Sequence, residues 1–170
     1  MKFLADSSLG RLARWLRMIG RDTATWRGET DRSFLRAAER EGRVVLTRRK
    51  DIIGRQHPGV VLFVENDRVE DQLGEVLGKL NLAPDPETFF TICLECNVPL
   101  MPAARDEVRD RIPEHVWRTQ RDFRLCPVCG RVYWPGTHRE RALGTLRRIL
   151  RLNTNSSTDR DGSEGKRVRG

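Results

Sequence analysis

The sequence contains no long hydrophobic run, little lysine and only four cysteines among its 170 residues. No apolar stretch approaches the roughly 20 residues that a helix needs to span a bilayer, so we expect a soluble protein. The acid at Asp6 interrupts any apolar core that a secretory leader would require. Without a secretory signal a disulfide framework is disfavoured, and reduced cysteines indicate a cytoplasmic protein.

Lysine is scarce because nearly all of the positive charge is arginine. Only four of the 32 basic residues are Lys. The 32 basic residues exceed the 24 acids, which gives a net charge of +8. The planar fork of donors in arginine matches phosphate, so this excess suggests a nucleic-acid partner. Arginine used simply to cover solvated faces would give the same balance, and charge alone does not decide between the two interpretations.

The cysteines fall into two C-x-x-C pairs separated by 29 residues. Each pair places two sulfurs on one tight turn, and two such turns complete a tetrahedral zinc site with no open position. A closed site is structural, whereas redox chemistry would need only one pair. We therefore expect Zn²⁺ to be held by Cys93, Cys96, Cys126 and Cys129. The gap exceeds the simplest ribbon spacing and predicts an insertion between the pairs.

Residues 1–82 alternate strand-like and helix-like segments. Apolar strand-like runs occupy 3–5, 23–26, 44–47 and 59–64, and amphipathic helical segments occupy 7–19, 30–40 and 67–80. This alternation with short connections predicts an α/β fold with a mostly parallel sheet and helices on both faces. The continuous apolar run at 59–64 is typical of a strand covered on both sides.

The sequence predicts four regions. These are an α/β domain (1–82), a linker (83–87), a Cys₄ zinc ribbon with a basic terminal helix (88–150) and a disordered tail (151–170). Two helical segments, 106–111 and 114–120, fill the predicted insertion and are separated at Pro113. The tail is predicted to be disordered because it contains almost no apolar residues.

Three aspartates are predicted to meet at one edge of the sheet. Asp6 follows the first strand, Asp31 opens the helix after the second, and Asp51 lies just beyond the third. Ligands of parallel sheets bind at the carboxyl ends of the strands, and carboxylates there would suit Mg²⁺ or Mn²⁺. Such an ion could orient a phosphodiester and ionise a water. Alternatively, the first two aspartates are helix caps and the third is a solvated loop acid.

A cationic face lies on the first predicted helix. Residues 7–21 contain no acid, and their arginines recur opposite the apolar positions. We expect contacts with a nucleic-acid backbone from Arg11, Arg14, Arg17 and Arg48. The alternative is that these arginines only keep the helix soluble.

Several motifs resemble the PIN-like ribonuclease domains of the Mut-seven-C type. The matching stretches are FLAD (3–6), LGRLARWLR (9–17), VLTR (45–48), YWPGTH (133–138) and the two cysteine pairs, so the resemblance covers about residues 1–140. It implies a PIN-like nuclease fold with an attached zinc ribbon, and metal-dependent hydrolysis of single-stranded RNA. Asp6 and Asp31 match acids of the family pattern.

One position departs from that pattern. Related domains commonly read Thr-Arg-Asp after the third strand, whereas this chain has Arg49 in place of the acid and Asp51 two residues on. An arginine in a metal pocket would repel the ion. Either Asp51 serves instead, or Glu65 beyond the fourth strand helps, or metal binding is weak.

Three hypotheses about function follow. The leading one is a cytoplasmic, metal-dependent endoribonuclease that hydrolyses single-stranded RNA. The second is a catalytically degenerate RNA-binding or ribosome-associated module that keeps the fold and the zinc ribbon. The third is an adaptor that uses the ribbon to bind a protein partner.

Overall fold

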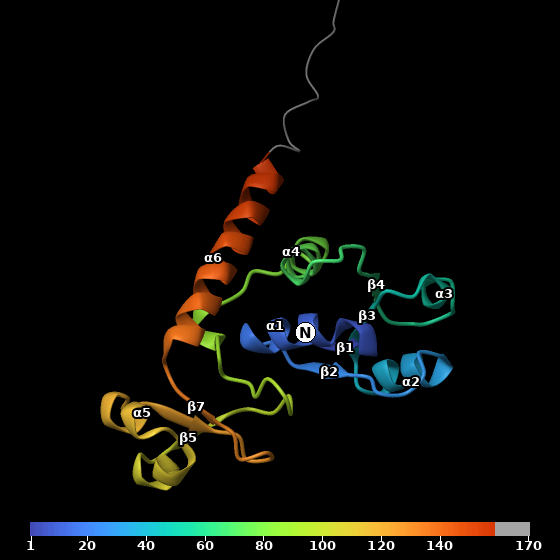
Figure 1. The fold of residues 1–170 in the computed structure, drawn as a ribbon. Helices are drawn as coiled ribbons and strands as arrows, with labels where there is room; N and C mark the ends of the chain where they lie inside the picture. The colour runs from blue at the N-terminus through green and yellow to red at the C-terminus, as the bar shows by residue number, and fades with distance from the viewer. Residues whose placement is uncertain (159–170) are drawn as a thin grey trace, which may run out of the picture.

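Two sheets organise the chain in the computed structural model, which describes residues 1–158 (Figure 1). The first sheet has four parallel strands in the order β2-β1-β3-β4. Its strands are β1 (Lys2–Ala5), β2 (Thr23–Thr25), β3 (Arg43–Thr47) and β4 (Val61–Phe63). The predicted α/β class is confirmed.

Helices cover both faces of this parallel sheet. One face carries α1 (Gly10–Met18), which follows the short 3-10 helix η1 (Ser7–Leu9), and α4 (Val69–Lys79). The other face carries α2 (Arg32–Arg40) and α3 (Lys50–Ile53). Successive strand residues point to opposite faces, so in β1 Phe3 and Ala5 pack toward α1 and α4 while Leu4 packs toward α2.

The second sheet is antiparallel and lies in the half of the chain that holds the cysteines. Its strands, in the order β5-β6-β7, are β5 (Met101–Ala103), β6 (Phe123–Leu125) and β7 (Val132–Tyr133). The predicted insertion consists of the 3-10 helix η3 (Asp106–Arg111) and α5 (Glu114–Thr119), with Pro113 between them. Another 3-10 helix, η2 (Pro86–Thr88), begins in the predicted linker and ends one residue beyond it.

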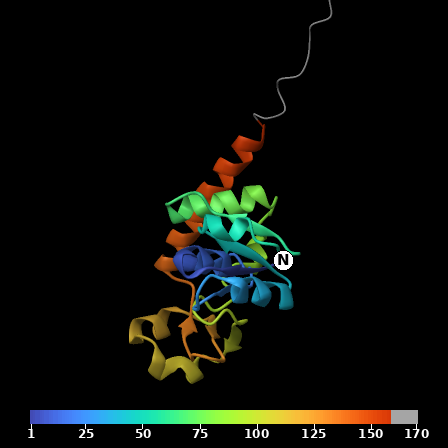
Figure 2. The same cartoon turned by 90° about the vertical axis from the view of Figure 1, so that its right-hand side faces the viewer.

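The last helix, α6 (Thr137–Thr158), returns from the second sheet to the first half of the molecule. Figures 1 and 2 show it lying alongside α4. Leu146 and Ile149 are buried in the same core as α1 and α4. The sequence predicted a basic helix over 139–150 and disorder from 151. Instead the helix continues to Thr158, and the rest of the predicted tail lies outside the described residues.

Each half has its own small apolar core. In the ribbon half it consists of Val108, Ile112, Val116 and Phe123, which come from the insertion and β6. The core of the first half is larger, and Leu146 and Ile149 of α6 are part of it. Over residues 1–158, no helix combines the length and hydropathy that crossing a membrane would demand.

Candidate functional site

The four cysteines converge on one point. Their Sγ atoms all lie within 4.8 Å of one another, and the Sγ atoms of Cys93 and Cys129 are 3.8 Å apart. Sulfurs about 2.3 Å from a tetrahedral zinc ion would be separated by about 3.8 Å. The donor set and its spacing therefore fit a metal ion, with all four positions filled by protein, as in a zinc ribbon.

Both cysteine turns close in the same way. The amide of Cys96 donates to Cys93 Sγ at 3.4 Å, and the amide of Cys129 donates to Cys126 Sγ at 3.5 Å. Each turn ends in a residue with positive φ, namely Asn97 and Gly130. This left-handed residue, which Asn and Gly adopt most readily, reverses the chain so that both sulfurs face the same point.

Tyr133 supports the first turn from β7. Its hydroxyl lies 3.3 Å from Cys93 Sγ and accepts a hydrogen bond from the amide of Leu94 at 3.2 Å. Burial opposes ionisation of Cys93, but the hydrogen bonds from Tyr133 and from backbone amides outweigh it and lower the pKa of this thiol to about 6. A thiolate is the form that binds a metal, so this environment favours ligation.

Asp6, the first predicted acid, is buried and fully hydrogen-bonded. It is 2 % exposed, and Oδ1 accepts from the amide and hydroxyl of Ser8 at 2.9 and 2.5 Å. Oδ2 accepts from Thr47 Oγ1 at 2.7 Å and from the amide of Arg48 at 2.9 Å. Asp6 thus caps η1 and ties the end of β1 to the end of β3.

The other two acids are also engaged by protein donors. Asp31 caps α2 by accepting from the Ser33 amide and hydroxyl at 2.8 and 2.6 Å, which lowers its pKa. Asp51 accepts from Arg49 at 2.9 and 3.1 Å and from Arg55 at 3.1 Å. The hydrogen bond from Arg49 is the main reason why the pKa of Asp51 is lowered.

The three aspartates do not form a second metal group. Among the described residues, the four cysteines are the group of His, Cys, Asp or Glu side chains close enough to share an ion. Arg49 also lies within electrostatic reach of Asp6 and Glu29, so a guanidinium already supplies positive charge at this edge. In this arrangement protein donors occupy the carboxylate oxygens of the three aspartates, and their role as metal ligands stays a prediction.

Arg17 differs from the other predicted RNA contacts because it is buried, with 6 % of the residue exposed. Its guanidinium donates to the carbonyl of Thr23 at 2.8 Å, to Thr25 Oγ1 at 2.9 Å and to the carbonyl of Leu94 at 2.5 Å. Burial lowers the pKa of Arg17. This side chain joins α1, β2 and the first cysteine turn, which gives it a structural task.

The remaining predicted arginines face solvent or surface acids. Arg11 and Arg14 are exposed on α1. Arg14 forms an ion pair with Glu95 at 2.9 Å, and Arg48 forms one with Asp67 at 2.6 Å. Exposed pairs of this kind contribute little to stability, so these guanidinium groups remain accessible to another anion.

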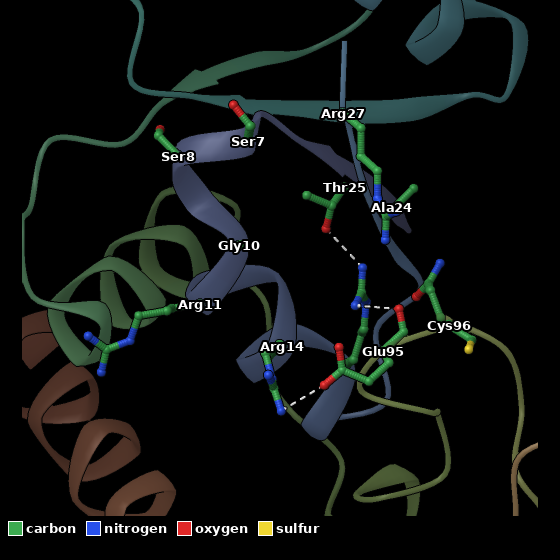
Figure 3. Close-up of a pocket in the computed structure, with 12 residues that line it drawn as sticks. Ser7, Ser8, Gly10, Arg11, Arg14, Ala24, Thr25, Arg27, Glu95 and Cys96 are labelled. Atoms are coloured by element: carbon green, nitrogen blue, oxygen red, sulfur yellow. Dashed lines mark hydrogen bonds and ion pairs between the residues drawn. The ribbon is translucent and has the colours of Figure 1, made fainter. Parts of the chain in front are cut away.

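An open pocket of about 640 Å³ lies where α1, the end of β2 and the first cysteine turn meet (Figure 3). Figure 3 shows Arg14 reaching toward Glu95, while Arg27 extends into the same region from beyond β2. Arg11 and Arg17 also line the pocket. The sequence did not predict that the cysteine turn would form a wall, because no local pattern links Glu95 to α1.

The parallel sheet with helices on both faces makes the first half an α/β domain. The four-cysteine group makes the second half a small module that could hold a metal ion. The family model of the Mut7-C RNAse domain matches residues 1–146. The chain therefore belongs to this family, and the resemblance inferred from its motifs is confirmed. No curated protein and no solved structure matches the chain.

Proposed function

We propose that the chain is a ribonuclease that binds single-stranded RNA across the carboxyl ends of β1 and β2. The observation that carries the proposal is the arginine-lined pocket at this edge. It begins at Ser7, the residue after Asp6, and extends to Arg27 beyond β2. The family assignment supports RNA as the substrate. We propose that the protein acts in the cytoplasm and that its partner is RNA.

We propose structural Zn²⁺ for the four-cysteine group. Zinc is the common ion of such sites, and four protein ligands leave no position for substrate or water. Its part in the function is to fix the ribbon and the turn that carries Glu95. RNA hydrolysis therefore has to take place on the first half.

The catalytic part of the proposal assigns Asp6, Asp31 and Asp51 as candidate ligands of Mg²⁺ or Mn²⁺. A divalent ion there would activate water and stabilise charge on phosphorus oxygens. Arg49 competes with such an ion because its guanidinium holds both carboxylate oxygens of Asp51. Divalent-ion dependence of RNA cleavage therefore tests this part of the proposal directly.

The direct test is cleavage of a fluorescently labelled single-stranded RNA in Mn²⁺. We expect Asp6→Asn and Asp51→Asn to lower the rate constant of cleavage at least a hundredfold. Loss of a metal ligand would remove most of the stabilisation that the ion gives to the transition state. Glu39→Gln, an exposed acid on α2, is the control and should leave the rate unchanged. Circular dichroism separates catalysis from folding, because Asp6 is also structural. Full activity in Asp6→Asn would refute the catalytic assignment.

The second candidate function is RNA binding without hydrolysis. The observation that favours it is the pairing of Asp51 with both Arg49 and Arg55. Calorimetric titration of Mn²⁺ into wild type and Arg49→Asp separates the candidates, with Arg36→Asp on the exposed face of α2 as control. Tight binding that arises only in Arg49→Asp would favour the binding module. Tight binding in wild type would favour the enzyme.

The adaptor hypothesis makes a different demand. Binding to phosphate weakens steeply with salt because counterions are released. Association with a protein that is insensitive to salt, together with no affinity for RNA, would support the adaptor and remove both RNA-based candidates.

A further inference from the structure

We propose that the pocket between α1, β2 and the first cysteine turn is a phosphate site. Its ligand is a backbone phosphodiester of single-stranded RNA, and Glu95 is an internal anion that the phosphate displaces. This inference deepens the proposed function and rests on RNA being the ligand. It assigns a specific task to a residue between two metal ligands that is not itself a ligand.

The pocket has a cationic lining on a fixed base. Arg17 is held by four hydrogen bonds to β2 and to the cysteine turn, so its position is set by the fold. Arg11, Arg14 and Arg27 are exposed around it. Against these four arginines, Glu95 is the one acid of the lining. The excess charge suits an anion.

The size and polarity of the pocket favour a polar ligand. A volume of about 640 Å³ falls within the range of roughly 300–1,000 Å³ that small-molecule sites occupy. The lining includes the hydroxyl-bearing residues Ser7 and Thr25, whereas the hydroxyl of Ser8 already donates to Asp6. Hydroxyl and guanidinium groups donate to phosphate oxygens, so a nucleotide unit suits this lining better than an apolar molecule does.

Glu95 occupies the arginines that a phosphate would use. Its Oε1 lies 2.9 Å from Arg14 Nη2 and 3.0 Å from Arg131 Nη1. The Glu95 side chain is 39 % exposed and that of Arg14 is 52 % exposed, so water screens the pair and breaking it costs little. A phosphodiester presents two non-bridging oxygens, which share one negative charge, to the same guanidinium fork and can replace the carboxylate.

The site requires both halves of the chain. Glu95 lies in the first cysteine turn, and Asn97 docks this turn on β2 by accepting from the Thr23 amide at 2.7 Å. Asn97 also donates to Asp22. The pocket therefore exists only while the turn is held against α1 and β2, so metal loading of the ribbon should shape a site on the sheet.

The test is fluorescence anisotropy with a labelled single-stranded oligoribonucleotide, titrated into zinc-loaded full-length protein at several salt concentrations. We expect Arg27→Gln to weaken binding on the order of tenfold and to reduce the slope of log affinity against log salt by about 0.7, because one phosphate contact is lost. We expect Glu95→Gln to tighten binding severalfold at low salt. The control, Arg36→Gln on α2, should change neither quantity.

The outcomes separate this inference from the proposed function. If Arg27→Gln and Glu95→Gln bind RNA as wild type does while wild type still cleaves RNA, the pocket is not the phosphate site and the enzyme proposal survives. If Glu95→Gln weakens binding, the displacement role is wrong. If wild type neither binds nor cleaves RNA, the proposed function fails as well.

Competition distinguishes an RNA phosphate from a free one. Inorganic phosphate and a nucleoside monophosphate are added to the labelled complex. Displacement only at concentrations far above that of unlabelled oligoribonucleotide supports the RNA site. Equal potency of the monophosphate and the oligoribonucleotide would overturn it in favour of a small-anion site.

Discussion

Arg17 donates a hydrogen bond to the carbonyl of Leu94, which lies 77 positions further along the chain, at 2.5 Å. The same guanidinium donates to Thr23 and Thr25 of β2. One buried side chain of the first helix therefore connects this helix to the edge strand of the parallel sheet and to the first cysteine turn. This contact and the hydrogen bond from the Thr23 amide to Asn97 hold the first cysteine turn against the parallel sheet.

Replacing Arg17 by Met should destabilise the protein by about 2–4 kcal/mol, because hydrogen bonds from a charged group are lost and buried carbonyls are left without donors. Urea denaturation followed by circular dichroism measures the change in the free energy of unfolding. Arg14→Met is the matched control on the same helix, with an exposed side chain, and should fall within about 0.5 kcal/mol of wild type. Equal effects of the two substitutions would contradict the structural role of Arg17.

Asp22 should make stability depend on pH in the acid range. Burial raises its pKa, but hydrogen bonds from Arg43 and Asn97 outweigh burial, so the folded-state pKa is below the ordinary value of 3.8. The contribution is therefore complete above the unfolded pKa and is lost as pH falls through the folded pKa. Asp22→Asn should lower the free energy of unfolding by about 1–3 kcal/mol at pH 7. It should also weaken the loss of stability that wild type shows as the pH falls below about 4.

The control for that pH profile is Asp71→Asn on α4, where the acid is exposed and lies 3.9 Å from Arg68. Urea midpoints at pH 7 and at about pH 3 should then differ as they do in wild type. An unchanged loss of stability at low pH in Asp22→Asn would show that other carboxylates dominate it.

Tyr133→Phe should weaken metal binding by about 10–100-fold, because groups that hydrogen-bond to a metal ligand tune its affinity to this extent. The hydroxyl contacts Cys93 Sγ and the Leu94 amide. Competition with a chromophoric zinc chelator measures the dissociation constant. Thr119→Ala removes a hydroxyl of the same half that contacts only backbone carbonyls of its own helix, and it should bind metal as wild type does.

Removing the metal should loosen the ribbon and leave the parallel sheet folded. Thiolates gathered within 4.8 Å repel one another without an ion, and this half has only a small core. After chelation, amide hydrogen exchange should accelerate in β5–β7 and stay slow in β1 and β3. Elemental analysis should give one zinc per chain before chelation, and unchanged protection of β6 afterwards would rule out a structural metal.

Leu146→Ala should destabilise the first half by about 2–5 kcal/mol, although the residue lies beyond the ribbon in sequence. Its side chain is fully buried in the core that α1 and α4 share, and truncation of a buried leucine leaves a cavity. Thermal unfolding monitored by tryptophan fluorescence provides the measurement. Thr145→Ala on the same helix is only partly buried and should be nearly neutral.

The sequence predicted most elements of the parallel sheet because their signals are local. Leu9, Leu12, Leu16 and Ile19 recur at helical spacing and are all buried. The four-residue helix α3 was not predicted, since it is too short to show a period. The docking of α6 was not predicted either, because periodicity identifies an apolar face and does not reveal which surface receives it.

In the candidate site, too, local features were predictable from the sequence and contacts between distant segments were not. The cysteine group followed from spacing, because each pair of sulfurs lies on one turn. The face of α1 suggested that Arg14 and Arg17 were equivalent, yet only Arg17 reaches carbonyls of a turn far along the chain. For Asp6 the sequence allowed either a cap or a metal ligand. Its four hydrogen bonds identify the cap, and a role in ligation stays a prediction.

The return of α6 to the first core changes how the ribbon should be regarded. The ribbon is an insertion between α4 and α6, two helices that pack against each other. It is not a separate module attached after a complete domain. A protein cut after α4 would lose Leu146 and Ile149 and leave an apolar groove open to water. Transplanting the nuclease half to another protein would therefore require carrying the ribbon with it, or joining α4 to α6 by a new loop.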